Sequence, residues 1–377
     1  MKIDPFGVEI WMNAHETRCQ FNLAETCVAS LTLAELLRIA GRNSDGLEEL
    51  LPVTLGYGEI EGSLRLRAAI AALYATRGAE DVIVTHGTIG ANDLAWRALV
   101  GPGDHVVSFA PTYQQHLSIP ESLGAEVDPL PLRPENGYLP DLSELRGLMR
   151  PDTRVVAFTN PNNPTGSLMP EGMLREVVAI AEEAGATVLA DEVYRGTAQE
   201  GDGRSPSVAD LSTRAVATAG MSKAFALAGL RLGWVSGPRG VLQAVSRHRD
   251  YTTISVGRLD DHLAALALEN ADRILDRSRA LTRRNLALLS DWVAVEPLID
   301  WVRPEAGTTA LLRYGIDMPS MALCEALLRD TGVLLTPGSV MGAEGTVRIG
   351  FGNRTEDLVA GLPLMSDWMG RAASAAA

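Results

Sequence analysis

Six short apolar runs, mostly separated by helical patterns, constrain the fold of this chain more than any other feature. They read DVIVT, HVVSFA, RVVAFT, TVLAD, AVATA and LGWVSG, and segments such as LREVVAIAEEAG lie between them. Apolar strands that alternate with helices indicate a mostly parallel sheet with helices on both faces. We therefore expect a large α/β domain over residues 46–250.

The segments on either side of this domain have a different character. Residues 1–45 combine short helical patterns with the aperiodic stretch FNLAETCVASLT, which we interpret as an arm with one helix near residues 31–40. After residue 250, a long periodic pattern predicts one or two linking helices. Short strands and helices then alternate, so we expect residues 251–377 to form, together with the arm, a smaller α+β domain.

Composition excludes several classes of protein. A net charge of −14 without any basic run argues against a nucleic-acid partner. No apolar stretch is long enough for a signal peptide or a membrane span. Three scattered cysteines do not make a disulfide framework or a metal site. We therefore expect a cytoplasmic protein that needs no metal and has no membrane or nucleic-acid partner.

Lys223 stands out because the chain contains only one other lysine, Lys2, while arginine fills nearly every other basic position. A guanidinium stays protonated near neutral pH and does not condense with an aldehyde, whereas a buried primary amine can lose its proton and condense with an aldehyde. Lys223 is therefore a candidate nucleophile, although a single lysine can also be an ordinary surface residue.

Four motifs follow the expected strands. The turn at residues 85–90 could hold a phosphate on backbone N–H groups, or it could be a tight turn between strand and helix. Tyr113 could stack on a planar ring or pack, and NPNNPTG at residues 160–166 could present amides to a ligand or be a structural turn. Asp191, followed by Tyr194, ends a strand, where a carboxylate could also bind magnesium or cap a helix.

The motifs together are far more specific than each alone. In order they are a glycine turn, PxY, NPxNPTG, DExY, SK and GxRxG, and in this order the chain resembles the fold type I pyridoxal-phosphate enzymes of the aspartate aminotransferase superfamily. The resemblance covers residues 57–348. It implies a seven-stranded sheet in the large domain, pyridoxal 5′-phosphate as cofactor, and a homodimer with shared active sites.

The resemblance also assigns catalytic roles. Lys223 would form the internal aldimine with the cofactor and, through the quinonoid, move the proton between Cα and C4′. Asp191 would keep the pyridine nitrogen protonated. Asn163 and Tyr194 would bond the phenolic oxygen of the ring, and Tyr113 would stack on it.

The cofactor phosphate would lie at the glycine turn. Many relatives place a serine where this chain has Gly220, so the site loses one hydroxyl donor that Ser222 or Thr88 could replace. A tyrosine from the neighbouring subunit would also reach the phosphate, and Tyr57 matches it. The remaining residues expected at this site are Gly87, Thr88, Ile89, Ser222 and Arg231.

The resemblance also assigns residues to the substrate. Arg348 would clamp the α-carboxylate, with Asn163 beside it. In the arm, Glu25 or Thr26 would add a polar group to the pocket, which favours a cationic or polar amino acid. Alternatively, Glu25 caps a helix that begins near residue 30, or is exposed. His116 could face the substrate, but we favour packing.

Transamination of an L-α-amino acid or an amino-acid conjugate is the leading hypothesis for the reaction. The same residues also support β-elimination by a C–S lyase, or a decarboxylating or oxidative reaction of secondary metabolism. No arginine clearly matches a clamp for a side-chain carboxylate, so aspartate is not the first choice of substrate. A non-catalytic effector-binding module is a weaker hypothesis, because Lys223, Asp191 and Arg231 are all retained.

Overall fold

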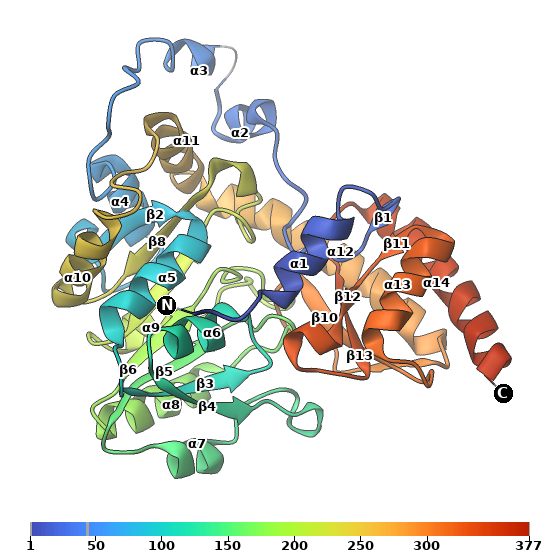
Figure 1. Cartoon of the computed structure of the whole chain (residues 1–377). Helices are drawn as coiled ribbons and strands as arrows, with labels where there is room; N and C mark the ends of the chain where they lie inside the picture. The colour runs from blue at the N-terminus through green and yellow to red at the C-terminus, as the bar shows by residue number, and fades with distance from the viewer. Residues whose placement is uncertain (1, 43–44, 377) are drawn as a thin grey trace.

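The computed structural model describes residues 2–42 and 45–376. A seven-stranded sheet with its helices forms the larger part, and the C-terminal third of the chain forms a smaller part beside it (Figure 1). The N-terminal helix α1 (Gly7–His15) lies with the smaller part, while the following helices α2 (Leu33–Ile39) and α3 (Asp45–Glu48) lie above the larger one.

The large sheet has the strand order β2-β8-β7-β6-β5-β3-β4. Strand β8 is antiparallel to both of its neighbours, and the other pairs are parallel, so the prediction of a mostly parallel sheet is confirmed. In sheet order the strands are β2 (Val82–His86), β8 (Leu232–Ser236), β7 (Val216–Gly220), β6 (Thr187–Asp191), β5 (Thr153–Thr159), β3 (His105–Ala110) and β4 (Glu126–Pro131).

The six apolar runs of the sequence match six of these strands, and the seventh, β4, has no such signal. Its sequence EVDPLP contains Pro129 and Pro131, and a proline cannot donate a hydrogen bond to a neighbouring strand. Strand β4 stands last in the sheet order and pairs with β3, so it is an edge strand, where this loss is tolerated.

Both faces of the sheet are buried, which explains its continuous apolar runs. On β5, Val156 packs into the core on one face and its neighbour Val155 into the core on the other. The covering helices are α4 (Leu64–Ala71), α5 (Gly87–Leu99), α6 (Gln115–Ser122), α7 (Leu142–Leu148), α8 (Glu171–Glu183), α9 (Val208–Leu211), α10 (Arg239–Arg249) and α11 (Arg258–Leu268).

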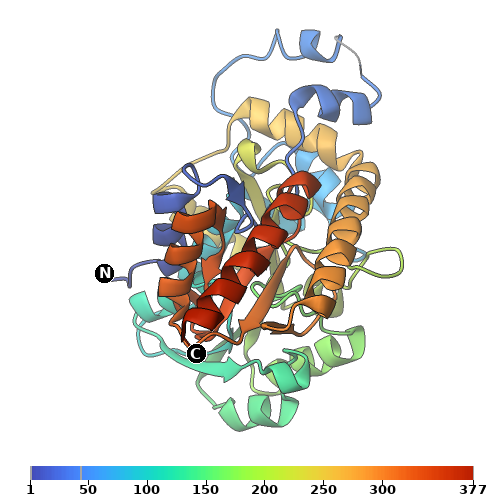
Figure 2. The ribbon, with the colours of Figure 1, turned by 90° about the vertical axis from the view of Figure 1, so that its right-hand side faces the viewer.

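The smaller part has its own hydrophobic core, built from both ends of the chain. Its residues include Trp11 and Leu23 from the arm and Ile349 and Trp368 from the C-terminal segment. The long helix α12 (Ala271–Val295) connects the two parts. Helix α14 (Thr355–Ala376) lies on the side of the smaller part that faces the viewer in Figure 2. The expected α+β domain formed by the arm and the C-terminal segment is confirmed.

The strands of this part form two small sheets. The four-stranded sheet has the order β12-β13-β10-β9, and β1 pairs in parallel with β11. The remaining elements are β1 (Phe21–Asn22), β9 (Ile299–Trp301), β10 (Thr309–Tyr314), α13 (Ser320–Thr331), β11 (Val333–Leu334), β12 (Thr336–Pro337) and β13 (Thr346–Gly350).

Over residues 2–42 and 45–376, no helix combines the length and apolar character needed to cross a membrane. The cytoplasmic location expected from the sequence stays a prediction.

Candidate active site

A cavity of about 450 Å³ collects most of the residues that the sequence singled out. It lies at the end of the large sheet where β6 finishes, and the arm and β13 also contribute to its wall. The expected residues that line it are Glu25, Thr26, Thr88, Ile89, Tyr113, Asn163, Asp191, Tyr194, Ser222, Lys223, Arg231 and Arg348. Two expected residues, Gly87 and Tyr57, are not part of the lining.

The amine of Lys223 contacts the arm. Its Nζ donates to Thr26 Oγ1 over 2.6 Å and to Cys27 Sγ over 3.3 Å. Burial alone would lower the pKa of Lys223, but Cys27, Tyr194 and Glu25 raise it overall. Glu25 is the partner that is ionised at neutral pH, since burial raises the pKa of Cys27 and of Tyr194. The cavity therefore holds this amine as an ammonium ion.

Asp191 is held from two sides at the end of β6. The side-chain amide of Asn92 donates to its Oδ2 over 2.8 Å, and the backbone N–H of Val193 donates to its Oδ1 over 3.0 Å. The carboxylate is 4% exposed. A buried carboxylate fixed in this way can present a negative charge to a cationic ring nitrogen.

His116 lies behind Asp191 and not in the wall of the cavity. Its Nε2 is 3.7 Å from Asp191 Oδ2, and its ring packs edge-on against Trp96. It is fully buried, and neither ring nitrogen has a hydrogen-bond partner among the described residues. The structure therefore favours packing over contact with substrate, as expected.

Asn92 was missed by the sequence reasoning. It connects three elements, because Thr218 on β7 donates to its Oδ1 over 2.6 Å while its amide bonds Asp191. A signal was available in the sequence. Asn92 lies four residues after Thr88 on helix α5, and residues four apart share one helix face, so both must point toward the same site.

The glycine turn between β2 and α5 forms a cradle beside Arg231. Gly87 has a φ of +69°, and a Cβ placed on it would lie 3.1 Å from the Arg231 guanidinium. A Cβ on Gly233 would lie 2.4 Å from the backbone N of Thr88, so β8 lies too close to the turn for any side chain at position 233. The result is a helix N-terminus with an arginine next to it, which suits an anion.

The glycine at position 220 is explained by the hydroxyl of Thr88. A Cβ on Gly220 would lie 2.3 Å from Thr88 Oγ1, so a serine does not fit there without a shift. Thr88 is 6% exposed, and its Oγ1 has no hydrogen-bond partner in the part of the chain that the structure describes. A buried hydroxyl without a partner costs free energy, which indicates that a ligand atom forms the missing hydrogen bond.

Arg348 is a buried cation surrounded by neutral acceptors. It is 2% exposed and donates to Asn163 Oδ1 and Thr336 Oγ1, each over 3.2 Å. Burial lowers the pKa of Arg348, although Tyr194 and Tyr113 oppose that effect. Within the described ranges it forms no ion pair with a carboxylate. It can therefore receive a carboxylate from a substrate.

Tyr113 faces the cavity with its hydroxyl group fixed. The hydroxyl donates to Glu9 Oε1 over 2.7 Å, and the ring lies 4.8 Å from that of Phe6. Burial, together with Glu9, raises the pKa of Tyr113. The phenol is therefore neutral, and its ring is available as an aromatic surface.

The conformation of the arm decides between the two readings of Glu25. Its Oε1 accepts the N–H groups of Thr26 and Cys27, both over 2.7 Å, while the residue lines the cavity. Helix α2 is capped by Thr32, whose hydroxyl accepts from the N–H of Glu35. The alternative that Glu25 caps this helix is therefore wrong, because it turns back on its own loop and Thr32 occupies the cap position.

Tyr57 does not reach the cavity of its own chain. It is 80% exposed and belongs to the segment that precedes α4. Leu51 and Leu55 of the same segment are 82% and 80% exposed. Such a group of exposed apolar side chains is typical of a surface that another molecule covers.

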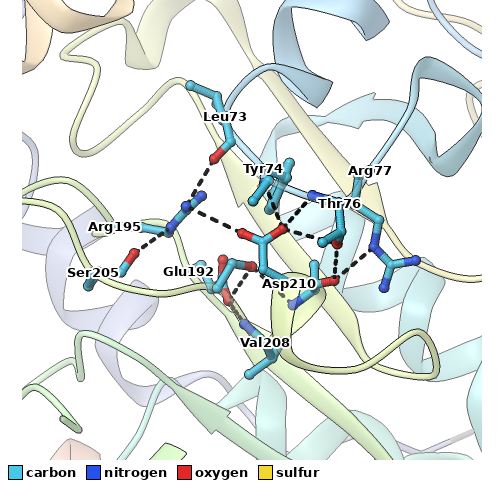
Figure 3. Close-up of polar contacts among 12 residues, drawn as sticks. Leu73, Tyr74, Thr76, Arg77, Glu192, Arg195, Ser205, Val208 and Asp210 are labelled. Carbon is cyan, nitrogen blue, oxygen red and sulfur yellow. Dashed lines mark hydrogen bonds and ion pairs between the residues drawn. The ribbon is translucent and has the colours of Figure 1, made fainter. Parts of the chain in front are cut away.

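A second cavity of about 540 Å³ involves the residue next to Asp191. Glu192 is 3% exposed, and its Oε1 accepts from the Ser207 hydroxyl and the Val208 N–H. Figure 3 shows it beside Arg195 and Asp210. Burial raises the pKa of Glu192 to about 7, an effect that Arg195 opposes and Asp210 adds to.

Comparisons with known proteins agree with this site. A family model described as aminotransferase class I and II matches residues 34–362. The chain is 33% identical to capreomycidine synthase of Streptomyces vinaceus, over 96% of this chain and 93% of the relative. It is 28% identical to arginine–pyruvate transaminase AruH of Pseudomonas aeruginosa, over 81% and 80%. A solved structure of a PLP-dependent aminotransferase from Streptococcus suis superposes with a TM-score of 0.95, at 41% identity and 99% coverage of both chains.

Proposed function

The chain belongs to the aminotransferase class I and II family, and from this premise we propose that its cavity transfers the amino group of an L-α-amino acid with a cationic side chain. Enzymes of this family depend on pyridoxal 5′-phosphate, and relatives of this chain are named as aminotransferases. The observation that carries the proposal is the enclosure of Lys223, Asp191 and Arg348 in one cavity.

The residues of the cavity fit the cofactor. Pyridoxal phosphate, when bound, supplies an aldehyde that bonds amines and a cationic ring that withdraws electrons from Cα of the amino acid. The unpartnered hydroxyl of Thr88 and the guanidinium of Arg231, beside the Gly87 turn, would hold its phosphate. Asp191, oriented by Asn92, would face the ring nitrogen.

The chain's own residues then divide the work. Lys223 would hold and return the proton of Cα, because, of the basic side chains that line the cavity, its ammonium gives up a proton far more readily than the guanidinium groups of Arg231 and Arg348. Arg348 would fix the α-carboxylate through two N–H groups, with Asn163 keeping the guanidinium in place. These contacts orient the substrate while the protein walls exclude water.

The charge of the cavity supports a cationic side chain in the substrate. Glu9, Glu16 and Glu25 line it together, all from the arm. The two arginines in the lining, Arg231 and Arg348, already serve the phosphate and the α-carboxylate. A third, anionic group of the substrate would therefore meet carboxylates and no free guanidinium, whereas an ammonium or guanidinium group would be attracted.

The reaction is tested with Lys223→Ala. The variant should bind pyridoxal phosphate but lose turnover in an assay that follows amino transfer from an amino acid to pyruvate. Retention of full activity would remove Lys223 from the reaction. As a folding control, Lys2→Ala should behave like the unmodified protein, because Lys2 is exposed.

The substrate class is tested with arginine and its neutral isostere citrulline. We expect kcat/KM to favour arginine, and Glu16→Gln to reduce this preference about two- to fivefold, as expected for the loss of one exposed attractive charge. Glu16 suits the test because it is exposed. Equal kcat/KM values for the two amino acids would contradict the proposal, even if transamination itself is retained.

A second reaction is supported by one observation. The relative with 33% identity is named a synthase and not a transaminase, so the same fold and site serve other reactions at this level of similarity. Elimination would release ammonia without an amino acceptor. Ammonia produced from the amino acid alone, faster than amino transfer to pyruvate, would identify elimination as the main reaction.

A homodimer is the assembly that we propose for the active enzyme. The exposed segment with Leu51, Leu55 and Tyr57 supports it, because it would be covered by a second copy. Tyr57 would then complete the phosphate site of the partner. Tyr57→Phe should weaken pyridoxal-phosphate binding about tenfold while the dimer persists in size-exclusion chromatography with light scattering. Unchanged binding would exclude this role.

A further inference from the structure

The arm residues Thr26 and Cys27 hold the amine of Lys223 without any help from a ligand. Thr26 Oγ1 accepts from Lys223 Nζ over 2.6 Å, and Cys27 Sγ lies 3.3 Å from the same nitrogen. These residues lie almost 200 positions before Lys223 in the chain. The contact therefore joins the arm of the smaller domain to the large domain.

The arm loop around Thr26 is fixed by hydrogen bonds that do not involve Lys223. Glu25 Oε1 accepts the N–H groups of both Thr26 and Cys27, and Thr308 Oγ1 donates to the Thr26 carbonyl over 2.6 Å. The N–H of Gly350, at the end of β13, donates to the carbonyl of Leu23 over 2.7 Å. The hydroxyl of Thr26 is therefore placed by bonds that do not involve Lys223.

Close packing reinforces these bonds. A Cβ on Gly350 would lie 1.8 Å from the carbonyl oxygen of Glu25, and a Cβ on Gly352 would lie 3.0 Å from that of Cys27. The loop thus rests directly on the backbone at the end of β13, and it cannot move toward β13 to release the amine.

The charges around the amine act in the same direction. Burial would lower the pKa of Lys223, but Cys27, Tyr194 and Glu25 raise it overall, and Glu25 is the one of these three that is charged at neutral pH. Burial, reinforced by Glu25, raises the pKa of Cys27 although Lys223 opposes the shift, so the thiol is a neutral partner at neutral pH. An ammonium ion that donates to a hydroxyl and a thiol, with a carboxylate nearby, is a stable arrangement.

We propose that Thr26 and Cys27 are positioning residues that hold the free amine of Lys223 on the arm side of the cavity whenever it is not bonded to the cofactor. The proposal rests on the role given to Lys223 above. In this arrangement Thr26 fixes where the amine waits, and therefore from which side it returns the proton to the substrate. Cys27 provides the second, weaker contact.

The test measures the reactivity of the free amine directly. The full chain is loaded with pyridoxamine 5′-phosphate, which leaves Lys223 unbonded, and is labelled with trace acetic anhydride at pH 8. Only the neutral amine reacts, so a held ammonium is labelled slowly. Because the chain has two lysines, exposed Lys2 is an internal reference in the mass spectrum.

We expect Thr26→Val to increase the labelling of Lys223 relative to Lys2 about tenfold. Valine has nearly the shape of threonine but lacks the hydroxyl that accepts a hydrogen bond from the ammonium. Thr26→Ser should restore the slow labelling, and Cys27→Ala should give a smaller increase. In steady-state assays, Thr26→Val should lower kcat about tenfold and leave KM within about twofold, since the substrate contacts are retained.

Two results would overturn the proposal. One is labelling of Thr26→Val at the rate of the unmodified protein; the other is labelling of Thr26→Ser as fast as that of Thr26→Val. Circular dichroism shows whether each variant folds, and Thr26→Ser keeps the test valid if Thr26→Val does not. The labelling needs no turnover, so it separates this proposal from the proposed reaction, which fails only if Lys223→Ala stays active.

Discussion

The amide of Asn92 donates to the Oδ2 atom of Asp191 over 2.8 Å, which ties helix α5 to the end of β6. The same helix begins at the glycine turn, so one rigid element carries both the anion cradle and the residue that orients the carboxylate. A change at the turn therefore moves the support of Asp191 as well.

Replacing Asn92 by leucine should weaken the binding of pyridoxal phosphate about tenfold or more. The buried carboxylate of Asp191 would lose one donor, and a hydrogen bond to a charged group contributes roughly 1.5–3 kcal/mol. Titration of the cofactor by its absorbance measures the effect. Thr218→Val, which removes only the bond to Asn92 Oδ1, should have a smaller effect in the same direction. Unaltered binding in Asn92→Leu would show that Asp191 does not need this support.

Replacing Gly220 by serine should destabilise the protein. The new Cβ would lie 2.3 Å from Thr88 Oγ1, and such overpacking costs about 1–3 kcal/mol. Thr88→Ala removes the hydroxyl that the new side chain would meet. The double variant Gly220→Ser/Thr88→Ala should therefore regain at least half of the lost free energy of unfolding, as measured by chemical denaturation. Simple additivity of the two changes would mean that the two sites do not compete for space.

The stability of the protein should depend on pH through Glu192. The pKa of this buried carboxyl group is about 7 in the folded protein, against an ordinary value of 4.5, mainly because of burial. Its contribution to stability is therefore fully present below about pH 4.5 and is lost as pH rises through 7, an effect of order 3 kcal/mol.

Glu192→Gln cannot lose a proton and should remove this decline, which denaturation at a series of pH values will measure. The matched control is Glu176→Gln, an exposed position on helix α8, which should leave the pH profile unchanged. If the profile of Glu192→Gln also follows that of the unmodified protein, Glu192 is not the group that titrates.

Arg348→Met should stabilise the substrate-free protein and lower its activity. The guanidinium is buried among neutral acceptors, and its burial is a cost that only a bound carboxylate would offset. We expect the free energy of unfolding to rise by about 1 kcal/mol, and kcat/KM for an α-amino acid to fall at least about a hundredfold. A loss of stability would instead assign Arg348 a structural role.

The repeated apolar runs made the sheet predictable, because both of its faces are buried and each strand is short and continuous. Strand β4 was not predictable in this way, since its prolines give no strand signal and only its place at the edge makes them tolerable. The number of linking helices after the sheet was also open, and Glu269 and Asn270 divide them into α11 and α12.

The presence of Lys223 and Arg348 in one cavity was predictable, because few residue types have the chemistry proposed for them. Cys27 was not, because a cysteine in an arm has many ordinary uses, and the spacing of Asn92 from Thr88 gives its helix face but not its partners, Asp191 and Thr218. Their roles depend on contacts between distant segments, as the bond from Lys223 to Thr26 shows. Such contacts follow from the tertiary structure and not from any local pattern.

The close packing of the arm loop against Gly350 and Gly352 also has a consequence for biosynthesis. The loop is made among the first thirty residues, yet the backbone on which it rests is made only near the end of the chain. Lys223 is also made before that backbone, so its contacts with Thr26 and Cys27 depend on a segment that is translated later. A chain that ends before β13 would therefore lack the backbone on which the arm loop rests.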